Sequence, residues 1–232
     1  MRDDIPGRDL RTAFTHPPPE AASGGNAGTS GPSATPSLAF IRWAVAEHRA
    51  PDAGRISDRF IVTSAPGGAL VGVVDGLGNG PEADQAAEST AATLESHAGQ
   101  PLWWLLQRCH VELRERHEAT MALTEVSRSG TLKWGGIADI GGTLVRSAVS
   151  TRHPEAAFRL AGSARFILPR VQLATTTLTR GDLVILATRG IVPGFARHVS
   201  LHDDPGTIAR RVLYRQRWGD EALVLVVRFV GT

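Results

Sequence analysis

Cysteine is almost missing from this chain of 232 residues, in which Cys109 is the only one. One cysteine cannot form an internal disulfide, so the class of small disulfide-rich secreted proteins is excluded. Its spacing from neighbouring leucines is helical, which indicates a buried core residue rather than a catalytic nucleophile. A run of about 18 apolar residues is missing as well, and the sequence therefore predicts no membrane span. The first six residues include two acids and lead into no apolar segment, so we expect no signal peptide and a cytoplasmic protein.

A large excess of one sign of charge is also lacking. The chain has 25 Lys and Arg residues against 23 Asp and Glu residues, a formal net charge of +2. So small an excess does not indicate binding to nucleic acid. The segment 205–218 is locally basic, and we interpret its arginines as a solvated or partner-facing surface rather than a nucleic-acid site.

Several catalytic signatures are missing. There is no G-x-S-x-G segment, so a serine hydrolase of that type is not predicted. His110 and His117 are seven residues apart, which is not the spacing of the H-E-x-x-H zinc helix. A Gly-Lys-Ser/Thr triplet is absent, so the chain has no P-loop for nucleotide phosphates.

The most informative segment is residues 74–81, VDGLGNGP, in which one aspartate enters a glycine-rich turn. Residues 69–74 are apolar and predict a strand, and residues 81–97 predict a helix. Proline in the first turn, early acids and alanines at helical spacing favour that helix over the hairpin that Asp-Gly often forms. The glycines allow a tight turn in which the Asp75 carboxylate and the Gly76 carbonyl face one point. Two oxygens on a rigid turn suit Mg²⁺ or Mn²⁺.

A nucleotide-binding module is a distant alternative for the same turn. Gly76, Gly78 and Gly80 do not follow the G-x-G-x-x-G pattern. An aspartate at the head of the turn would also repel a phosphate unless a metal lay between them. We therefore favour a metal site over a bare phosphate site.

The amino-acid composition of the sequence changes near residue 37. Residues 1–36 are dominated by Pro, Gly, Ser, Ala and Thr and predict a disordered leader, whereas residues 37–232 are long enough for one folded domain. Runs of strands separated from helices indicate an α+β fold of antiparallel sheets. The expected strands are 38–47, 60–64, 69–74, 120–126, 132–140, 143–150, 157–160, 174–178, 183–188 and 222–230, and the expected helices are 81–97, 101–115 and 205–218.

Five segments, taken in order, resemble the motifs of the SpoIIE branch of the PPM (protein phosphatase 2C-like) phosphatases, and within it the small RsbX-like enzymes. They are ISDRF at 56–60, VDGLGNGP at 74–81, GTLKWGGIAD at 130–139, GDLVILATRGI at 181–191 and DEALVLVV at 220–227. Each segment alone is a weak signal, and their joint order is specific. The resemblance implies a four-layer α-β-β-α sandwich of two antiparallel sheets flanked by helices.

The same resemblance implies a catalytic site with two Mn²⁺ or Mg²⁺ ions. Asp75 would bridge the ions, with the Gly76 carbonyl as a neutral ligand and with Asp58 and Asp220 beside it. Asp139 would be a peripheral metal ligand, although an ordinary loop acid is an equally good interpretation. Each aspartate by itself is typical of a turn or a cap, and only the matching motif positions raise them to candidates.

Three positions depart from the family pattern. Arg189 stands where the family has a metal-binding aspartate, Asn79 replaces a histidine, and Glu118 replaces a glycine. The resemblance implies a metal-dependent serine/threonine phosphatase acting on phosphorylated regulators of a bacterial stress or sigma-factor switch, impaired by Arg189. The alternative is a pseudophosphatase that binds phosphoproteins without turnover, and Arg189 favours it because a guanidinium stays charged and opposes a nearby cation.

Overall fold

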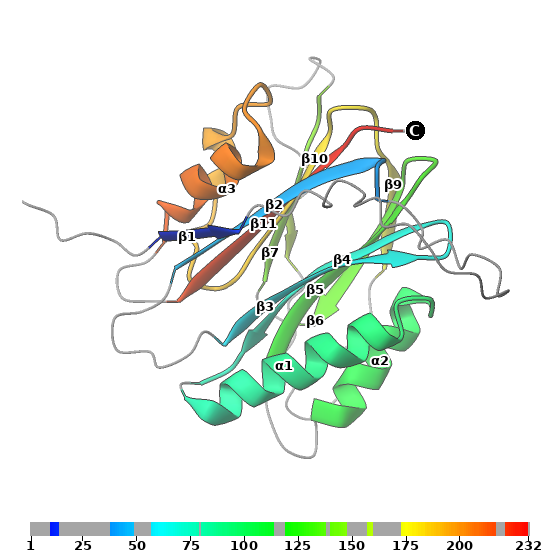
Figure 1. Cartoon of the computed structure of the whole chain (residues 1–232), viewed down its shortest axis with the longest axis vertical. Coiled ribbons are helices and arrows are strands. Elements are labelled where there is room, and N and C mark those ends of the chain that lie inside the picture. Colours follow the sequence, from blue (N-terminus) through cyan, green and yellow to red (C-terminus); the bar gives the residue numbers. More distant parts are fainter. Residues whose placement is uncertain are drawn as a thin grey trace, which may run out of the picture.

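Two antiparallel β-sheets face each other in this computed structural model, and helices cover their outer faces (Figure 1). The structure describes residues 10–13, 38–48, 57–78, 80–113, 119–137, 140–147, 157–159, 173–216 and 221–231. In this part of the chain no helix is both long enough and apolar enough to cross a membrane.

The five-stranded sheet has the order β3-β4-β5-β6-β9, with every neighbouring pair antiparallel. Strand β4, between β3 and β5, is buried along its whole length because it is covered on both faces. A tight turn at Gly67, with φ of 76°, joins β3 to β4. The strands are β3 (Asp58–Ala65), β4 (Gly68–Gly76), β5 (Ala119–Ser127), β6 (Thr131–Ile137) and β9 (Ala174–Thr177).

The six-stranded sheet has the order β1-β2-β11-β10-β7-β8 and is also antiparallel throughout. Its central strand β11 is rich in valine and leucine and almost wholly buried. The strands are β1 (Leu10–Ala13), β2 (Ile41–His48), β7 (Gly141–Val145), β8 (Ala157–Arg159), β10 (Leu183–Ala187) and β11 (Ala222–Phe229).

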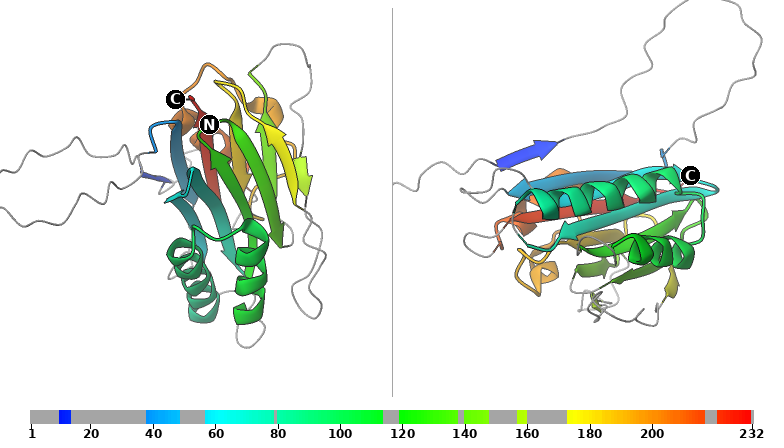
Figure 2. Two further views of the ribbon diagram at one scale, coloured as in Figure 1. Left: turned by 90° about the vertical axis from the view of Figure 1, so that its right-hand side faces the viewer. Right: turned by 90° about the horizontal axis from the view of Figure 1, so that it is seen from below.

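The helices form the two outer layers (Figures 1 and 2). Helices α1 (Pro81–Ser96) and α2 (Leu102–Leu113) pack on the five-stranded sheet, and α3 (Pro205–Leu213) packs on the six-stranded sheet beside the short 3-10 helix η1 (Phe195–His198). Strand periodicity separates the layers: Val71 and Val73 lie in the core between the sheets, whereas Leu70 and Val74 face α1 and α2. The expected α+β sandwich of four layers is confirmed.

Cys109 lies in the core between α2 and the five-stranded sheet, and its burial raises the pKa of the thiol to about 12. A thiol that stays protonated at neutral pH is a poor nucleophile, in agreement with the structural role expected from the sequence.

Three element boundaries need correction. Leu10–Ala13, within the leader expected to be disordered, pairs with β2, because the edge of that strand offers free backbone groups. Helix α3 ends at Leu213 rather than near residue 218, because the chain turns there and Ile191 bridges Gln216. Strand β7 ends at Val145 rather than residue 150, because the Ser147 amide donates to the Asp182 carboxylate at 2.7 Å. The rest of residues 1–36 lies outside the described residues, so their disorder stays a prediction.

Candidate active site

Asp58 and Asp75 face each other across two neighbouring strands. Asp58 is the first residue of β3, and its Cα partner in the ladder is Asp75, near the end of β4. Residues directly opposite in an antiparallel pair project to the same face of the sheet. Both aspartates are buried, and the partners described below come from the other sheet. The structure therefore brings together two of the three predicted catalytic aspartates between the sheets.

Burial and crowding make these two carboxyl groups hard to ionise. Burial raises the pKa of Asp58 well above its usual value, and the neighbouring Asp75 carboxylate raises it further. Burial also raises the pKa of Asp75, while the positive charge of Arg189 acts in the opposite direction. A pair of buried carboxylates is stabilised by positive charge placed between or beside them.

Arg189 supplies such a charge. Its Nε donates to Asp75 Oδ2 at 2.8 Å, and its backbone amide lies 3.4 Å from the same oxygen. The Arg189 side chain is 46% exposed, so the guanidinium reaches from the surface to a buried acid. At the position where the sequence motif leads us to expect a metal-binding aspartate, the structure thus has an ion pair.

Thr188 ties the two sheets together beside this pair. Its Oγ1 donates to Asp58 Oδ2 at 2.8 Å and accepts from the Leu223 amide at 2.9 Å. Asp58 belongs to the five-stranded sheet and Leu223 to the six-stranded one. From the sequence, Thr188 is expected only as the last residue of a strand. The signal available was its place before Arg189 in the T-R-G segment.

We expect Thr188→Val to lower the free energy of unfolding by about 2 kcal/mol, because it leaves a buried carboxyl group and a buried amide without a partner. Chemical denaturation of the two proteins measures the difference. Thr188→Ser keeps the hydroxyl and should lose less than about 1 kcal/mol. A valine variant as stable as the native protein would contradict the bridging role.

Glycine is required at two points around the aspartates. A Cβ on Gly76 would lie 2.2 Å from the carbonyl oxygen of Ala83 in α1, and one on Gly190 would lie 1.9 Å from the Glu221 carbonyl oxygen. Real side chains do not tolerate such contacts, so these glycines let backbone segments approach closely. The helix α1 and the start of β11 are thereby held against the candidate site.

Two predicted site residues, Asp139 and Asp220, lie outside the described residues. The residue after Asp220 is described: Glu221 Oε2 accepts hydrogen bonds from the Ser57 amide at 3.0 Å and the Ser57 hydroxyl at 2.9 Å. Glu221 therefore lies beside Ser57, the residue before Asp58. The roles of Asp139 and Asp220 stay predictions.

Thr120 is a further residue that the sequence analysis missed. It is the Cα partner of Asp75 on β5, and its buried hydroxyl oxygen has no hydrogen-bond partner among the residues that the structure describes. A polar atom left unpaired in this position is a natural place for a bound water or ion. No sequence signal distinguished it from an ordinary strand threonine.

The oxygen atoms present are of the chemical kind that a divalent cation takes as ligands. The carboxylates of Asp58 and Asp75, the Gly76 carbonyl and the Thr120 hydroxyl are the kind of hard ligands that Mg²⁺ and Mn²⁺ prefer. A second cation fits poorly, because one oxygen of Asp75 is bound by Arg189. Within the described ranges, no group of three or more His, Cys, Asp or Glu residues is arranged to hold a metal.

No protein-family model and no curated protein sequence matches the chain. Among solved structures, RsbX in complex with magnesium superposes with a TM-score of 0.73 at 16% identity, covering 83% of this chain and 97% of RsbX. A structure from work on the bacterial stressosome superposes with a TM-score of 0.71 at 24% identity, covering 81% and 99% of the two chains.

The chain has the protein phosphatase 2C fold. A third similar structure, the PP2C phosphatase domain of SpoIIE from Bacillus subtilis with a fragment of its regulatory domain, gives a TM-score of 0.65 at 21% identity over 83% of this chain and 64% of that one. The resemblance noted in the sequence motifs is thus confirmed in the fold, since the similar structures include RsbX and the phosphatase domain of SpoIIE. In this PP2C fold the aspartate pair lies between the two sheets, which is where Arg189 reaches it.

Proposed function

We propose that this chain is a metal-dependent phosphoprotein serine/threonine phosphatase of low activity, acting on phosphorylated regulators of a bacterial stress or sigma-factor switch. The observation that carries the proposal is the buried Asp58–Asp75 pair of a PP2C fold, partly neutralised by Arg189. Solved structures of RsbX and of a stressosome-related protein share this fold, which supports the signalling context.

In this proposal Asp58, Asp75 and the Gly76 carbonyl would hold one Mg²⁺ or Mn²⁺ ion, with Asp220 as a further ligand and Asp139 as a peripheral one. The ion would supply a water activated for attack and positive charge for the phosphoryl oxygens. Thr188 keeps the Asp58 carboxylate turned between the sheets through its 2.8 Å hydrogen bond. Arg189 binds Asp75 through Nε, and its exposed guanidinium presents further N–H donors that suit phosphate oxygens.

A second candidate is a pseudophosphatase that binds phosphoproteins without hydrolysing them. The Arg189–Asp75 ion pair is the specific observation in its favour, because a fixed cation occupies an oxygen that a metal would need. Both candidates bind a phosphorylated side chain, and they differ only in turnover.

Two measurements on the native protein separate the candidates. The first is the release of phosphate from a phosphoserine peptide as MnCl₂ is raised from micromolar to millimolar concentration. We expect slow hydrolysis that needs millimolar metal, and loss of that activity in Asp75→Asn. The second is binding of the same peptide in EDTA, which should persist. Binding without hydrolysis at any metal concentration would establish the pseudophosphatase. The absence of both hydrolysis in MnCl₂ and binding in EDTA would reject both candidates.

A further inference from the structure

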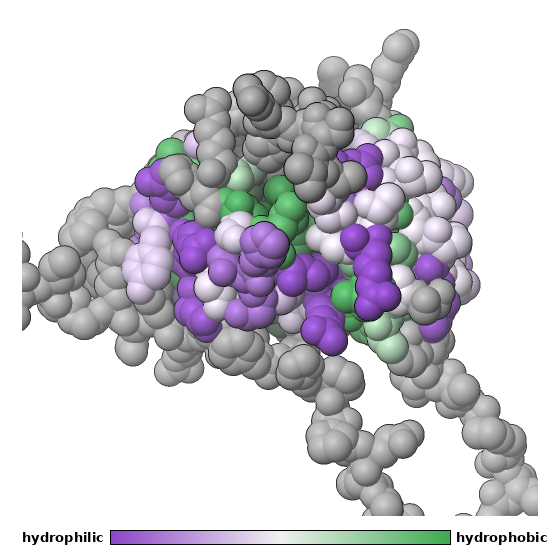
Figure 3. Space-filling model, turned by 90° about the horizontal axis from the view of Figure 1, so that it is seen from above, coloured by the Kyte–Doolittle hydropathy of each residue, from purple (hydrophilic) through white to green (hydrophobic). Residues whose placement is uncertain are grey.

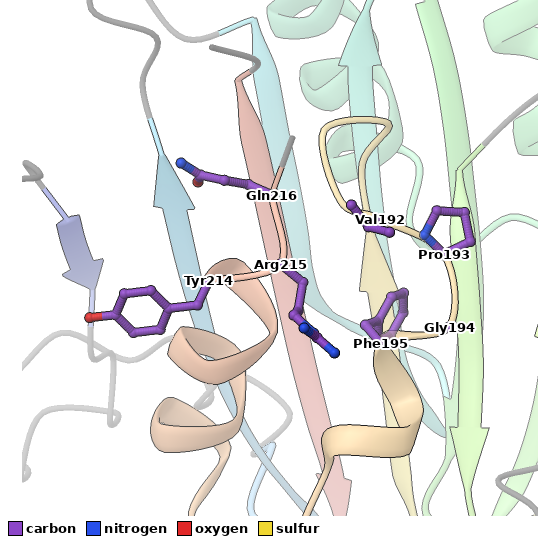
Figure 4. Close-up of a pocket in the computed structure, with 7 residues that line it drawn as sticks. All are labelled: Val192, Pro193, Gly194, Phe195, Tyr214, Arg215 and Gln216. Atoms are coloured by element: carbon purple, nitrogen blue, oxygen red, sulfur yellow. The ribbon is translucent and has the colours of Figure 1, made fainter. Parts of the chain in front are cut away.

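A hollow of about 650 Å³ opens between the segment that follows Arg189 and the end of α3. Val192, Pro193 and Phe195 form one side, and Arg215 and Gln216 form the other. Figure 4 shows the Arg215 side chain extending toward Phe195, so a cation and an apolar wall share the same space. Its size is in the range of pockets that hold small ligands or peptide side chains.

The hollow adjoins the candidate active site through the backbone. Val192 follows Arg189 by three residues, so the two are at most about 11 Å apart along the chain. The segment after Arg189 and the segment after α3 are joined by an isolated β-bridge between Ile191 and Gln216. A 3.0 Å hydrogen bond from the Val192 amide to the Arg215 carbonyl also holds them together. A phosphorylated side chain at Arg189 would therefore have its neighbouring residues within reach of the hollow.

The lining of the hollow is partly apolar and partly cationic, which suits a peptide. Five large apolar side chains are exposed in the described part of the chain, and two of them, Val192 at 45% and Tyr214 at 59%, border this hollow. Seen from above, the coloured surface is mainly hydrophilic or intermediate, with smaller apolar areas between (Figure 3). Arg215 is exposed at the rim, where its positive charge can attract a carboxylate.

We propose that this hollow binds the residues next to the phosphorylated side chain of a protein substrate, an apolar one against Val192, Pro193 and Phe195 and an acidic one at Arg215. The inference rests on the proposed function and names the kind of sequence that the site selects. Arg189 and Arg215 then form one basic track, complementary to a phosphate followed or preceded by a carboxylate.

The test measures fluorescence anisotropy of labelled peptides with the full chain in EDTA, where metal-dependent turnover is absent. One phosphoserine peptide has Glu and Leu on both sides; matched peptides replace Glu by Lys, replace Leu by Ser, or lack the phosphate. We expect the native protein to prefer Glu over Lys about tenfold. Arg215→Glu should reverse that preference, and Val192→Ser should remove a preference for Leu over Ser of about threefold.

Arg108→Glu is the matched control, because it makes the same change in net charge on the far helix α2, where Arg108 pairs with Glu112. It should leave the preference for Glu as it is. Circular dichroism checks that each variant folds, and Arg215→Gln replaces Arg215→Glu if the latter does not. The glutamine variant should then lose the preference for Glu over Lys, and a preference that it keeps would contradict the inference.

Three results would overturn the inference. If phosphorylation governs binding but neither Arg215 nor Val192 variants change the flanking preferences, the hollow is not a peptide site and the proposed function survives. If the phosphate makes no difference in the native protein, the proposed function fails and the inference with it. If the native protein is a dimer that Arg215→Glu dissociates without altering peptide preference, the hollow is instead an interface between copies of this chain.

Discussion

Replacing Arg189 with aspartate is expected to raise the affinity of this protein for Mn²⁺ at least about tenfold and to raise its phosphatase turnover with it. In the native protein the Arg189 Nε holds Asp75 Oδ2 at 2.8 Å, so the guanidinium takes one oxygen that a metal could use. Asp75 itself is buried, so its carboxylate has little contact with water.

The size of the effect follows from electrostatics. A monovalent and a divalent cation about 4 Å apart repel by about 2 kcal/mol even at the dielectric constant of water, and by more in a partly buried site. Arg189→Asp removes that repulsion, frees Asp75 and adds a carboxylate ligand. Without metal, three acids would then crowd one site, so the melting temperature of the variant should fall and be restored by MnCl₂.

Isothermal calorimetry with MnCl₂ measures the metal affinity and thermal melts measure the stability, so both test this prediction independently of activity. Arg189→Gln removes the charge but adds no ligand and should be intermediate. Arg211→Asp makes the same change in net charge at the surface pair with Asp203 and should leave metal affinity as it is. A folded Arg189→Asp protein that binds metal no better would contradict the electrostatic argument. One that hydrolyses more slowly would show that phosphate binding by Arg189 outweighs the gain in metal affinity.

Asp182→Asn is expected to lower the free energy of unfolding by about 3 kcal/mol at neutral pH. The Asp182 carboxylate is fully buried where β10 begins and accepts from the amides of Ser147 and Thr179 at 2.7 and 2.9 Å. It also accepts from both hydroxyls, and Arg146 lies 3.1 Å away as an ion-pair partner. An asparagine would turn one N–H₂ group toward these donors.

The pH dependence has a definite sign. Burial alone would raise the pKa of Asp182, but the backbone amides of Ser147 and Thr179, the Ser147 hydroxyl and Arg146 together lower it below its usual value. A carboxyl whose pKa is depressed by folding stabilises the protein above the unfolded value of about 3.9 and loses that contribution as the pH falls through the folded pKa. The difference between native and Asp182→Asn proteins should be constant from about pH 5 to 8 and shrink below about pH 4.

Urea unfolding at several pH values measures this difference. Asp203→Asn is the matched control, since it removes the same charge from a surface pair with arginine and should cost less than about 1 kcal/mol. Equal losses in the two variants, or a difference that grows toward acid pH, would contradict the assigned role of Asp182.

The pairing of Asp58 with Asp75 could be anticipated because both lie at strand ends that an antiparallel hairpin brings to one edge. Their partners could not. Thr188 and Arg189 are more than a hundred residues away and directly follow β10 of the opposite sheet, so their contacts depend on how the two sheets face each other. Local sequence has no signal for the angle and offset of that packing.

By itself the sequence determined the secondary structure of nearly every element, because strand and helix periodicities and the glycine and proline breaks are local properties. It also marked Arg189 as the departure from a metal-binding motif. Only the tertiary structure decided what Arg189 does, because its bond to Asp75 is made across the two sheets. The same holds for the Thr120 hydroxyl beside Asp75, for the buried Asp182 carboxylate at the start of β10, and for the hollow beside Arg215. Each depends on distant segments meeting, and no local pattern encodes such meetings.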